Sequence, residues 1–114
     1  IPLDADLVFD VRFLPNPYYI PELRDGTGLD EDVRNFVFQY QATKDFVEKL
    51  EDLINFTLPQ YLEEGKTELV IAIGCTGGRH RSVAVAKELS DFITKRGYTV
   101  VSRHRDMDRR GTRG

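Results

Sequence analysis

Residues 69–82 join an apolar run directly to a glycine-rich turn and then to the start of a helix. The run is Leu-Val-Ile-Ala-Ile, and three of the five residues that follow it are glycines. Beyond the turn, apolar residues recur at helical spacing up to about residue 96. A strand that passes through a glycine turn straight into a helix is typical of α/β folds, in which helices connect parallel strands.

The remaining segments indicate the same architecture. Residues 6–13 are mostly apolar, which predicts a first strand that is buried on both faces. Residues 29–40 show the apolar spacing of a helix, and residues 98–102 predict a third strand. A second helix is expected from Thr43, as its N-cap, towards residue 65.

The expected order is therefore β–α–α–β–α–β. Pro59 is expected to kink or interrupt the second of these helices. Because connections between parallel strands cross over through helices, the order predicts a small parallel sheet with helices on both faces. Residues 14–28 contain three prolines and two glycines, which predicts a long ordered loop rather than a helix or strand.

The composition excludes several classes of protein. A chain of 114 residues is expected to form a single domain. The single cysteine excludes an internal disulfide and favours a cytoplasmic location. No apolar run approaches a membrane span, so no membrane partner is expected. A net charge of −3 excludes a uniformly basic nucleic-acid-binding domain, and a start without methionine indicates a piece of a longer protein.

The turn at residues 74–82 carries the residue types of an anion site. Ligands of parallel sheets bind beyond the carboxyl ends of the strands. Glycines allow successive N–H groups to face one concavity, a helix N-terminus favours negative charge, and arginine forks suit phosphate. The sequence lacks the Gly-Lys-Ser/Thr of a Walker A loop. A tight glycine turn followed by two solvated arginines is the alternative interpretation.

Asp10 and Arg12 end the first strand on the same side, either as part of this site or as an ion pair that shapes the loop. A second function, from another class, is a phosphatase. Cys75 and Arg81 have the Cys-x5-Arg spacing in which a thiolate attacks phosphorus. No close-spaced histidine or cysteine pair is present, so no metal site is expected.

The last twelve residues, 103–114, carry five arginines against two aspartates. Arginines in such an end can contact the phosphates of RNA, and a solvated tail is the alternative. The arginines expected to contact RNA are Arg103, Arg105, Arg109, Arg110 and Arg113.

Motifs along nearly the whole chain resemble the C-terminal domain of the RapZ/YvcJ family, in its Gram-positive branch. They are Asp10–Pro17, Leu23–Arg24, Thr27–Asp30, Ile73–Gly78, His80–Val83 and Arg103–Arg105. The resemblance implies a fold like a phosphofructokinase subdomain and a regulatory role rather than catalysis. It also implies an N-terminal P-loop domain, absent from this chain, that binds and weakly hydrolyses ATP and GTP.

The resemblance implies that the domain senses a phosphorylated amino sugar or a nucleotide-sugar. It further implies binding of a small RNA, presentation of that RNA to an endoribonuclease, and assembly into homo-oligomers. Tyr18 stands where the enterobacterial pattern has a histidine, so it keeps a hydroxyl but changes the reach and charge of the side chain at this position. The residues expected to form the metabolite site are Asp10, Arg12, Tyr18, Thr27, Gly28, Cys75, Thr76, Gly77, Gly78, His80, Arg81 and Ser82.

Overall fold

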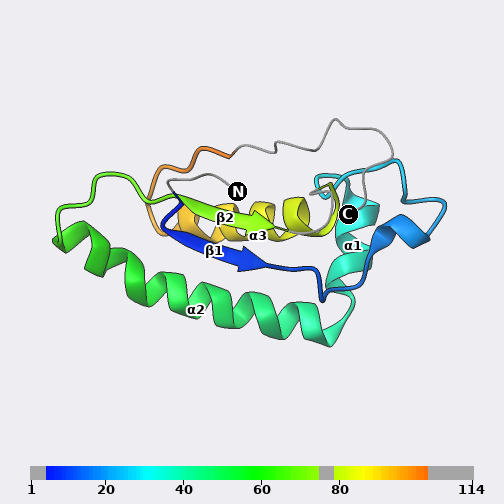
Figure 1. The fold of residues 1–114 in the computed structure, drawn as a ribbon, viewed down its shortest axis with the longest axis horizontal. Helices are drawn as coiled ribbons and strands as arrows, with labels where there is room; N and C mark the ends of the chain where they lie inside the picture. The colour runs from blue at the N-terminus through cyan, green and yellow to red at the C-terminus, as the bar shows by residue number, and fades with distance from the viewer. Residues whose placement is uncertain (1–4, 75–78, 103–114) are drawn as a thin grey trace.

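The computed structural model describes residues 5–74 and 79–102. It is an α/β arrangement of two parallel strands and three α-helices (Figure 1). In chain order the elements are β1 (Leu7–Asp10), the 3-10 helix η1 (Pro17–Tyr19), α1 (Glu31–Phe38), α2 (Gln41–Glu63), β2 (Ile71–Gly74) and α3 (Arg81–Lys95). None of the helices in these two ranges is long and apolar enough to cross a membrane.

The two strands pair in parallel, with Leu7 opposite Ile71 and Asp10 opposite Gly74. The amide of Val11 donates to the carbonyl of Gly74 at 2.8 Å, which extends the pairing just past the end of β1. Both arrows in Figure 1 point towards the end of the molecule at which α3 begins and where the proline-rich loop lies. The carboxyl ends of both strands therefore lie at the same edge of the sheet, as the parallel topology predicts.

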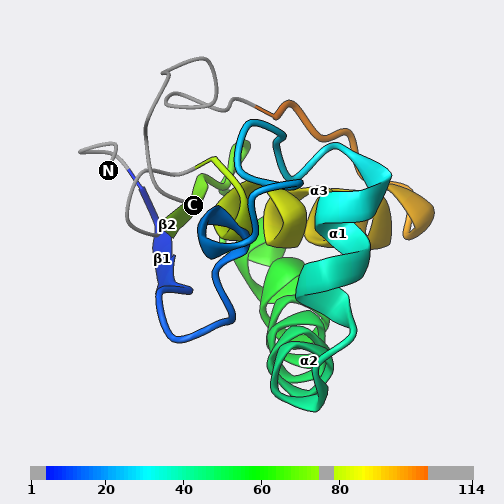
Figure 2. The ribbon, with the colours of Figure 1, turned by 90° about the vertical axis from the view of Figure 1, so that its right-hand side faces the viewer.

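The three helices lie on one side of the sheet (Figure 2). In β1, Leu7 and Phe9 pack against the core, whereas Val8 between them is 48% exposed. The expectations of helices on both faces and of a first strand buried on both faces are therefore wrong for the described residues. Val8 made the segment look continuously apolar, although only alternate side chains of β1 contact the helices.

Residues 98–102 do not form the third strand that was expected. They belong to no β-ladder, although Tyr98 and Val100 pack against the core while Val101 is 78% exposed. This alternation is that of an extended segment, which is why the sequence resembles a strand. Side-chain contacts anchor the segment, and within residues 5–74 and 79–102 the sheet has two strands rather than three.

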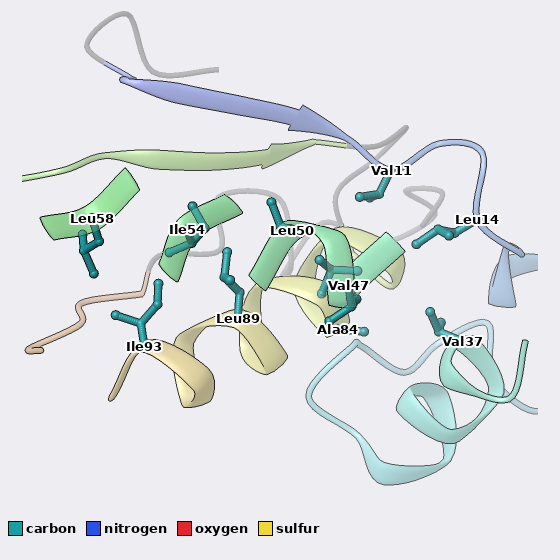
Figure 3. Packing of buried hydrophobic residues seen from close by; sticks show 11 residues of the cluster. Val11, Leu14, Val37, Val47, Leu50, Ile54, Leu58, Ala84, Leu89 and Ile93 are labelled. Atoms are coloured by element: carbon teal, nitrogen blue, oxygen red, sulfur yellow. The ribbon is translucent and has the colours of Figure 1, made fainter. Parts of the chain in front are cut away.

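The core lies between the sheet, α2 and α3 (Figure 3). From α2, Val47, Leu50 and Ile54 point inward at spacings of three and four residues, and they meet Leu89 and Ile93 of α3. Each fully buried side chain of this size contributes roughly 1.5–3 kcal/mol relative to exposure. The apolar stripes on these two helices thus hold the sheet over the α2–α3 pair.

The long helix α2 differs from expectation at two points. Thr43 is not its N-cap: Tyr40 occupies that position, and Thr43 is fully buried in the first turn. The helix also continues through Pro59 to Glu63. Because Pro59 is exposed and lies near the end of the helix, it removes one backbone hydrogen bond without disturbing the core. Gly97, with φ of +93°, follows α3 as a C′ residue, as predicted.

Candidate functional site

At the end of β1 an ion pair orients Arg12. The carboxylate of Asp10 accepts hydrogen bonds from the backbone amide of Arg12 at 2.9 Å and from its Nε at 2.8 Å. The Nη2 atom of Arg12 lies 2.7 Å from Oδ2 of Asp10, and both side chains are exposed. These hydrogen bonds, with a smaller effect of the Arg81 charge, hold the pKa of Asp10 below its ordinary value. Asp10 and Arg12, which the sequence places on one side of the strand end, therefore form an ion pair there.

Arg81, the first residue of α3, contacts the backbone just after the end of β1. Its Nη1 donates to the carbonyls of Arg12 at 2.5 Å and of Leu14 at 3.1 Å. Arg81 is only 5% exposed, so these hydrogen bonds fix its guanidinium at the edge of the sheet. A carbonyl oxygen is neutral and orients the guanidinium without cancelling its charge. Ser82, also 5% exposed, follows in the first turn of the helix.

The second half of the proline-rich loop packs on the N-terminus of α3. The amide of Gly28 donates to the carbonyl of Arg79 at 3.0 Å. In return, Arg79 donates from Nε to the carbonyl of Gly26 at 3.0 Å and from Nη2 to that of Asp25 at 2.6 Å. The role of Arg79 as a loop anchor was missed from the sequence, because these partners are backbone atoms about fifty residues away. Gly28, a glycine within a recognised motif, was the available signal.

His80 completes this loop–helix contact. Its side chain is fully buried, and its Nε2 lies 3.0 Å from the carbonyl oxygen of Arg24. Because a carbonyl oxygen can only accept, Nε2 carries the hydrogen. Burial lowers the pKa of His80, and the charge of Arg79 acts in the same direction, while the carbonyl of Arg24 partly opposes them. His80 is therefore a neutral, buried side chain at the loop contact.

The loop residues Tyr18 and Thr27 are held by local contacts. The guanidinium of Arg24 lies 5.0 Å from the ring centre of Tyr18, and its Nε donates to the Tyr18 carbonyl at 2.9 Å. The hydroxyl of Thr27 accepts from the amide of Leu29 at 3.2 Å, and its own amide donates to Asp30 at 2.9 Å. Thr27 thus shapes the turn that leads into α1. Tyr18 stacks on Arg24, the residue whose carbonyl His80 contacts.

The structure brings the expected site residues into two groups. Asp10, Arg12 and Arg81 meet at the end of the sheet. Ser82 follows Arg81 in the helix, and the loop–helix contact holds Gly28 and His80. Several expected residues lie outside the described residues: Cys75, Thr76, Gly77, Gly78, Arg103, Arg105, Arg109, Arg110 and Arg113. The predictions of a cysteine nucleophile and of RNA contacts fall there. Within residues 5–74 and 79–102, no three histidine, cysteine, aspartate or glutamate side chains gather as metal ligands.

An open hollow beside the start of α1 does not suit an anion. Acidic side chains dominate its polar lining, and they would repel a phosphate. A second, narrower hollow lies between α2 and α3 near residue 96, with mostly apolar walls. The lining residues of the first hollow are Glu22, Leu23, Gly26, Asp30, Glu31, Asp32, Val33 and Asn35. The arginine-lined edge of the sheet, rather than either hollow, has the charge for an anionic ligand.

The amino-acid sequence of this chain is similar to the sequences of known proteins. A family model described as the RapZ C-terminal domain matches residues 1–108. A nucleotide-binding protein of Caldanaerobacter subterraneus subsp. tengcongensis is 60% identical over 107 residues, which cover 94% of this chain and 38% of that protein. Nucleotide-binding proteins of Bacillus cytotoxicus and Clostridium novyi are 59% identical over 110 residues and 54% identical over 108 residues.

These two matches cover 96% and 95% of this chain but 37% of each relative. The chain thus spans just over a third of the length of the curated relatives that it matches.

Proposed function

The chain belongs to the RapZ C-terminal domain family, and from that premise we propose that it is a regulatory domain that binds a phosphorylated sugar. The site is the edge of the sheet where β1 ends and α3 begins. The ligand class is an amino sugar phosphate or a nucleotide-sugar. The observation that carries the proposal is the pair of hydrogen bonds from Arg81 to the backbone carbonyls of Arg12 and Leu14, which fixes the Arg81 guanidinium at the edge of the sheet where Arg12 also lies.

Three features at this edge favour a phosphate. The N-terminus of α3 has backbone N–H groups that no residue of the helix accepts, and the helix dipole favours negative charge there. Arg81 is fixed in place, so little side-chain entropy is lost when it binds an anion. Arg12 is oriented by Asp10 and is exposed to the solvent from which a ligand arrives. Guanidinium forks match phosphate oxygens better than an ammonium does.

The same edge offers a group for the sugar. The carboxylate of Asp10 is half exposed, and its lowered pKa keeps it ionised at neutral pH. A carboxylate accepts hydrogen bonds from hydroxyl groups and pairs with the ammonium of an amino sugar. A ligand with an anionic and a cationic end therefore matches Arg81 and Asp10 better than inorganic phosphate does.

The wider roles follow from the family and are part of the proposal. The relatives are named nucleotide-binding proteins, and we assign ATP and GTP binding to a P-loop domain outside this chain. The arginines of residues 103–114 would contact a small RNA, which the full protein would present to an endoribonuclease as a homo-oligomer. Binding of the sugar phosphate would regulate that presentation.

The test is a calorimetric titration of the chain with glucosamine 6-phosphate, glucose 6-phosphate, glucosamine and inorganic phosphate. We expect glucosamine 6-phosphate to bind most tightly. Arg12→Ala, at an exposed position, should weaken the affinity for glucosamine 6-phosphate by roughly tenfold to a hundredfold, which is the effect of one charged hydrogen-bonding group. Arg96→Ala is the matched control, because Arg96 is exposed at the opposite end of α3 and stacks on Phe92.

Binding that is equal in wild type and Arg12→Ala would contradict the proposed site, and no binding of any sugar phosphate would contradict the proposed function. Cys75→Ser should leave binding intact. Turnover of an aryl phosphate that is lost in Cys75→Ser would instead establish the phosphatase.

A further inference from the structure

Hydrogen bonds join the second half of the proline-rich loop to the start of α3. We call this contact the loop clasp and define it as residues 24–28 against residues 79–84. Its hydrogen bonds are Gly28 to Arg79, Arg79 to Gly26 and Asp25, and His80 to Arg24. All of them end on backbone carbonyls of a loop or turn, so the loop contributes shape and no ion pair to them. The clasp fixes the loop that carries Tyr18 and Arg24 beside the helix N-terminus.

His80 is the titratable group at the centre of the clasp. Its Nε2–H donates to the carbonyl of Arg24, so in the neutral ring Nδ1 has no hydrogen. Nδ1 is buried and has no hydrogen-bond partner among the residues that the structure describes. A second proton would be placed on this atom, and the positive ring would lie in a buried position next to a guanidinium. An unpartnered buried charge is strongly unfavourable.

The groups that face the ring come from both sides of the clasp. On the helix side, the nearby charge is the guanidinium of Arg79, which disfavours a second positive charge. On the loop side, the backbone carbonyls of Leu23, Arg24 and Gly26 favour the charged ring. Two of these carbonyls already accept other hydrogen bonds: that of Leu23 from the Gly26 amide, and that of Gly26 from Arg79. Burial and the charge of Arg79 outweigh these carbonyls, since the pKa of the ring lies below its ordinary value.

We propose that His80 is a proton-sensitive latch: a second proton on its ring opens the loop clasp and separates residues 24–28 from the start of α3. Opening also weakens the anion site, and this second step rests on the proposed function. The anion site and the clasp share the first turn of α3, since Arg81 follows His80 directly. The latch thus adds a dependence on pH that the ligand itself does not impose.

The pH range follows from the direction of the pKa. The pKa of His80 in the folded chain lies below its ordinary value, because burial disfavours the charged ring. The neutral ring therefore stabilises the clasp fully above about pH 6.5, the unfolded value. That contribution is lost progressively as the pH falls below about 6.5 towards the folded value.

The first test does not involve a ligand. Amide hydrogen exchange of Gly28 and Ala84 is measured by NMR at pH 7.5 and 5.5 and corrected for intrinsic exchange rates, with the Ile54 amide in α2 as reference. We expect the protection of Gly28 to fall by up to about tenfold relative to Ile54, because pH 5.5 lies about one pH unit below the ordinary histidine pKa of about 6.5. In His80→Gln, whose side chain does not titrate but can donate to Arg24, the ratio should stay constant.

The same spectra give a readout that needs no variant. The pKa of the His80 ring, followed in wild type, should lie below about 6.5. A ring that titrates at or above that value, or Gly28 protection that does not change between the two pH values, would overturn the latch even if a ligand binds. This keeps the inference testable if His80→Gln does not fold.

The second test uses sulfate, which stays a dianion over the whole range. Wild type should bind sulfate more weakly at pH 5.5 than at pH 7.5, and His80→Gln should bind it equally at both. Failure to bind any sugar phosphate at pH 7.5 contradicts the proposed function alone, since the exchange experiment still reports on the clasp. Sulfate affinity that falls equally in wild type and His80→Gln overturns the link between the latch and the anion site.

Discussion

Gly28 lies so close to α3 that a Cβ atom on it would fall 2.2 Å from the backbone nitrogen of Ala84. The carbonyl oxygen of His80 would be 2.4 Å away and the carbonyl carbon of Val83 2.8 Å away. All three are backbone atoms of one helical turn, so no side-chain rotation can relieve the overlap. The close approach lets the Gly28 amide reach the carbonyl of Arg79.

Gly28→Ala should therefore separate the loop from α3. We expect a loss of about 1–3 kcal/mol in the free energy of unfolding, the usual range for overpacking, measured by urea denaturation. Gly26→Ala is the matched control in the same loop, because its Cβ would meet side-chain atoms of Asp30 and Val33 instead. The close packing of Gly28 would be disproved if the two variants were equally stable.

Arg81→Lys tests whether the guanidinium fork at the sheet edge contributes to stability. Lysine keeps the charge but cannot present two N–H groups in the fixed geometry that reaches Arg12 and Leu14. We expect the free energy of unfolding to fall by about 1.5–3 kcal/mol in thermal or urea unfolding. Arg96→Lys, at an exposed position, should change it by about 0.5 kcal/mol or less. Equal effects of the two substitutions would contradict a structural role for the Arg81 fork.

Two leucines three residues apart on α2 should differ in their contribution to stability. Leu50 is 3% exposed and packs in the core, whereas Leu53 is 43% exposed. Leu50→Ala should cost about 2–5 kcal/mol, because it leaves a cavity in the core. Leu53→Ala should cost about 1 kcal/mol or less, since much of its side chain is already in water. Chemical denaturation of both variants distinguishes them, and a larger loss for Leu53→Ala would show that α2 is rotated relative to this structure.

The pKa of Asp6 should lie below its ordinary value of about 3.9. Its carboxylate accepts from the Val70 amide at 2.8 Å and pairs with Nζ of Lys66 at 2.9 Å. The backbone hydrogen bond has the larger effect on this pKa. Lys66→Met should therefore leave part of the lowering in place, as followed by NMR titration of the Asp6 carboxyl. A return to about 3.9 in that variant would assign the effect to the ion pair.

The sign of the stability change follows from the same pKa. Because the folded pKa of Asp6 is lowered, its ionised form stabilises the start of the β1–β2 pairing above about pH 3.9. This contribution is lost as the pH falls below that value. Asp6→Asn should accordingly make the free energy of unfolding less dependent on pH in the acid range.

Local patterns in the sequence predicted the helices better than the strands. The apolar spacing of residues 29–40 and of the segment after residue 79 corresponds to α1 and α3, and Gly97 ends α3 as expected. Helical spacing is a local property of the sequence, so a helix can be predicted from it without knowledge of the fold. The strands are shorter than predicted, because a strand ends where its partner ends, and β2 extends only over Ile71–Gly74.

The sequence by itself determined the α/β class, the parallel strands and the meeting of Asp10, Arg12 and Arg81 at one edge. These follow from periodicity and from the rule that parallel strands end on the same side of a sheet.

The tertiary structure alone decided how the helices cover the sheet, that residues 98–102 are anchored without pairing, and that Arg79 and His80 clasp the loop. Those features depend on contacts between residues about fifty positions apart, and on backbone carbonyls, which have no signature in the identity of any side chain. The net charge of −3 could not reveal two guanidinium groups at one edge, because it sums over the chain, whereas the fold determines where each charge lies.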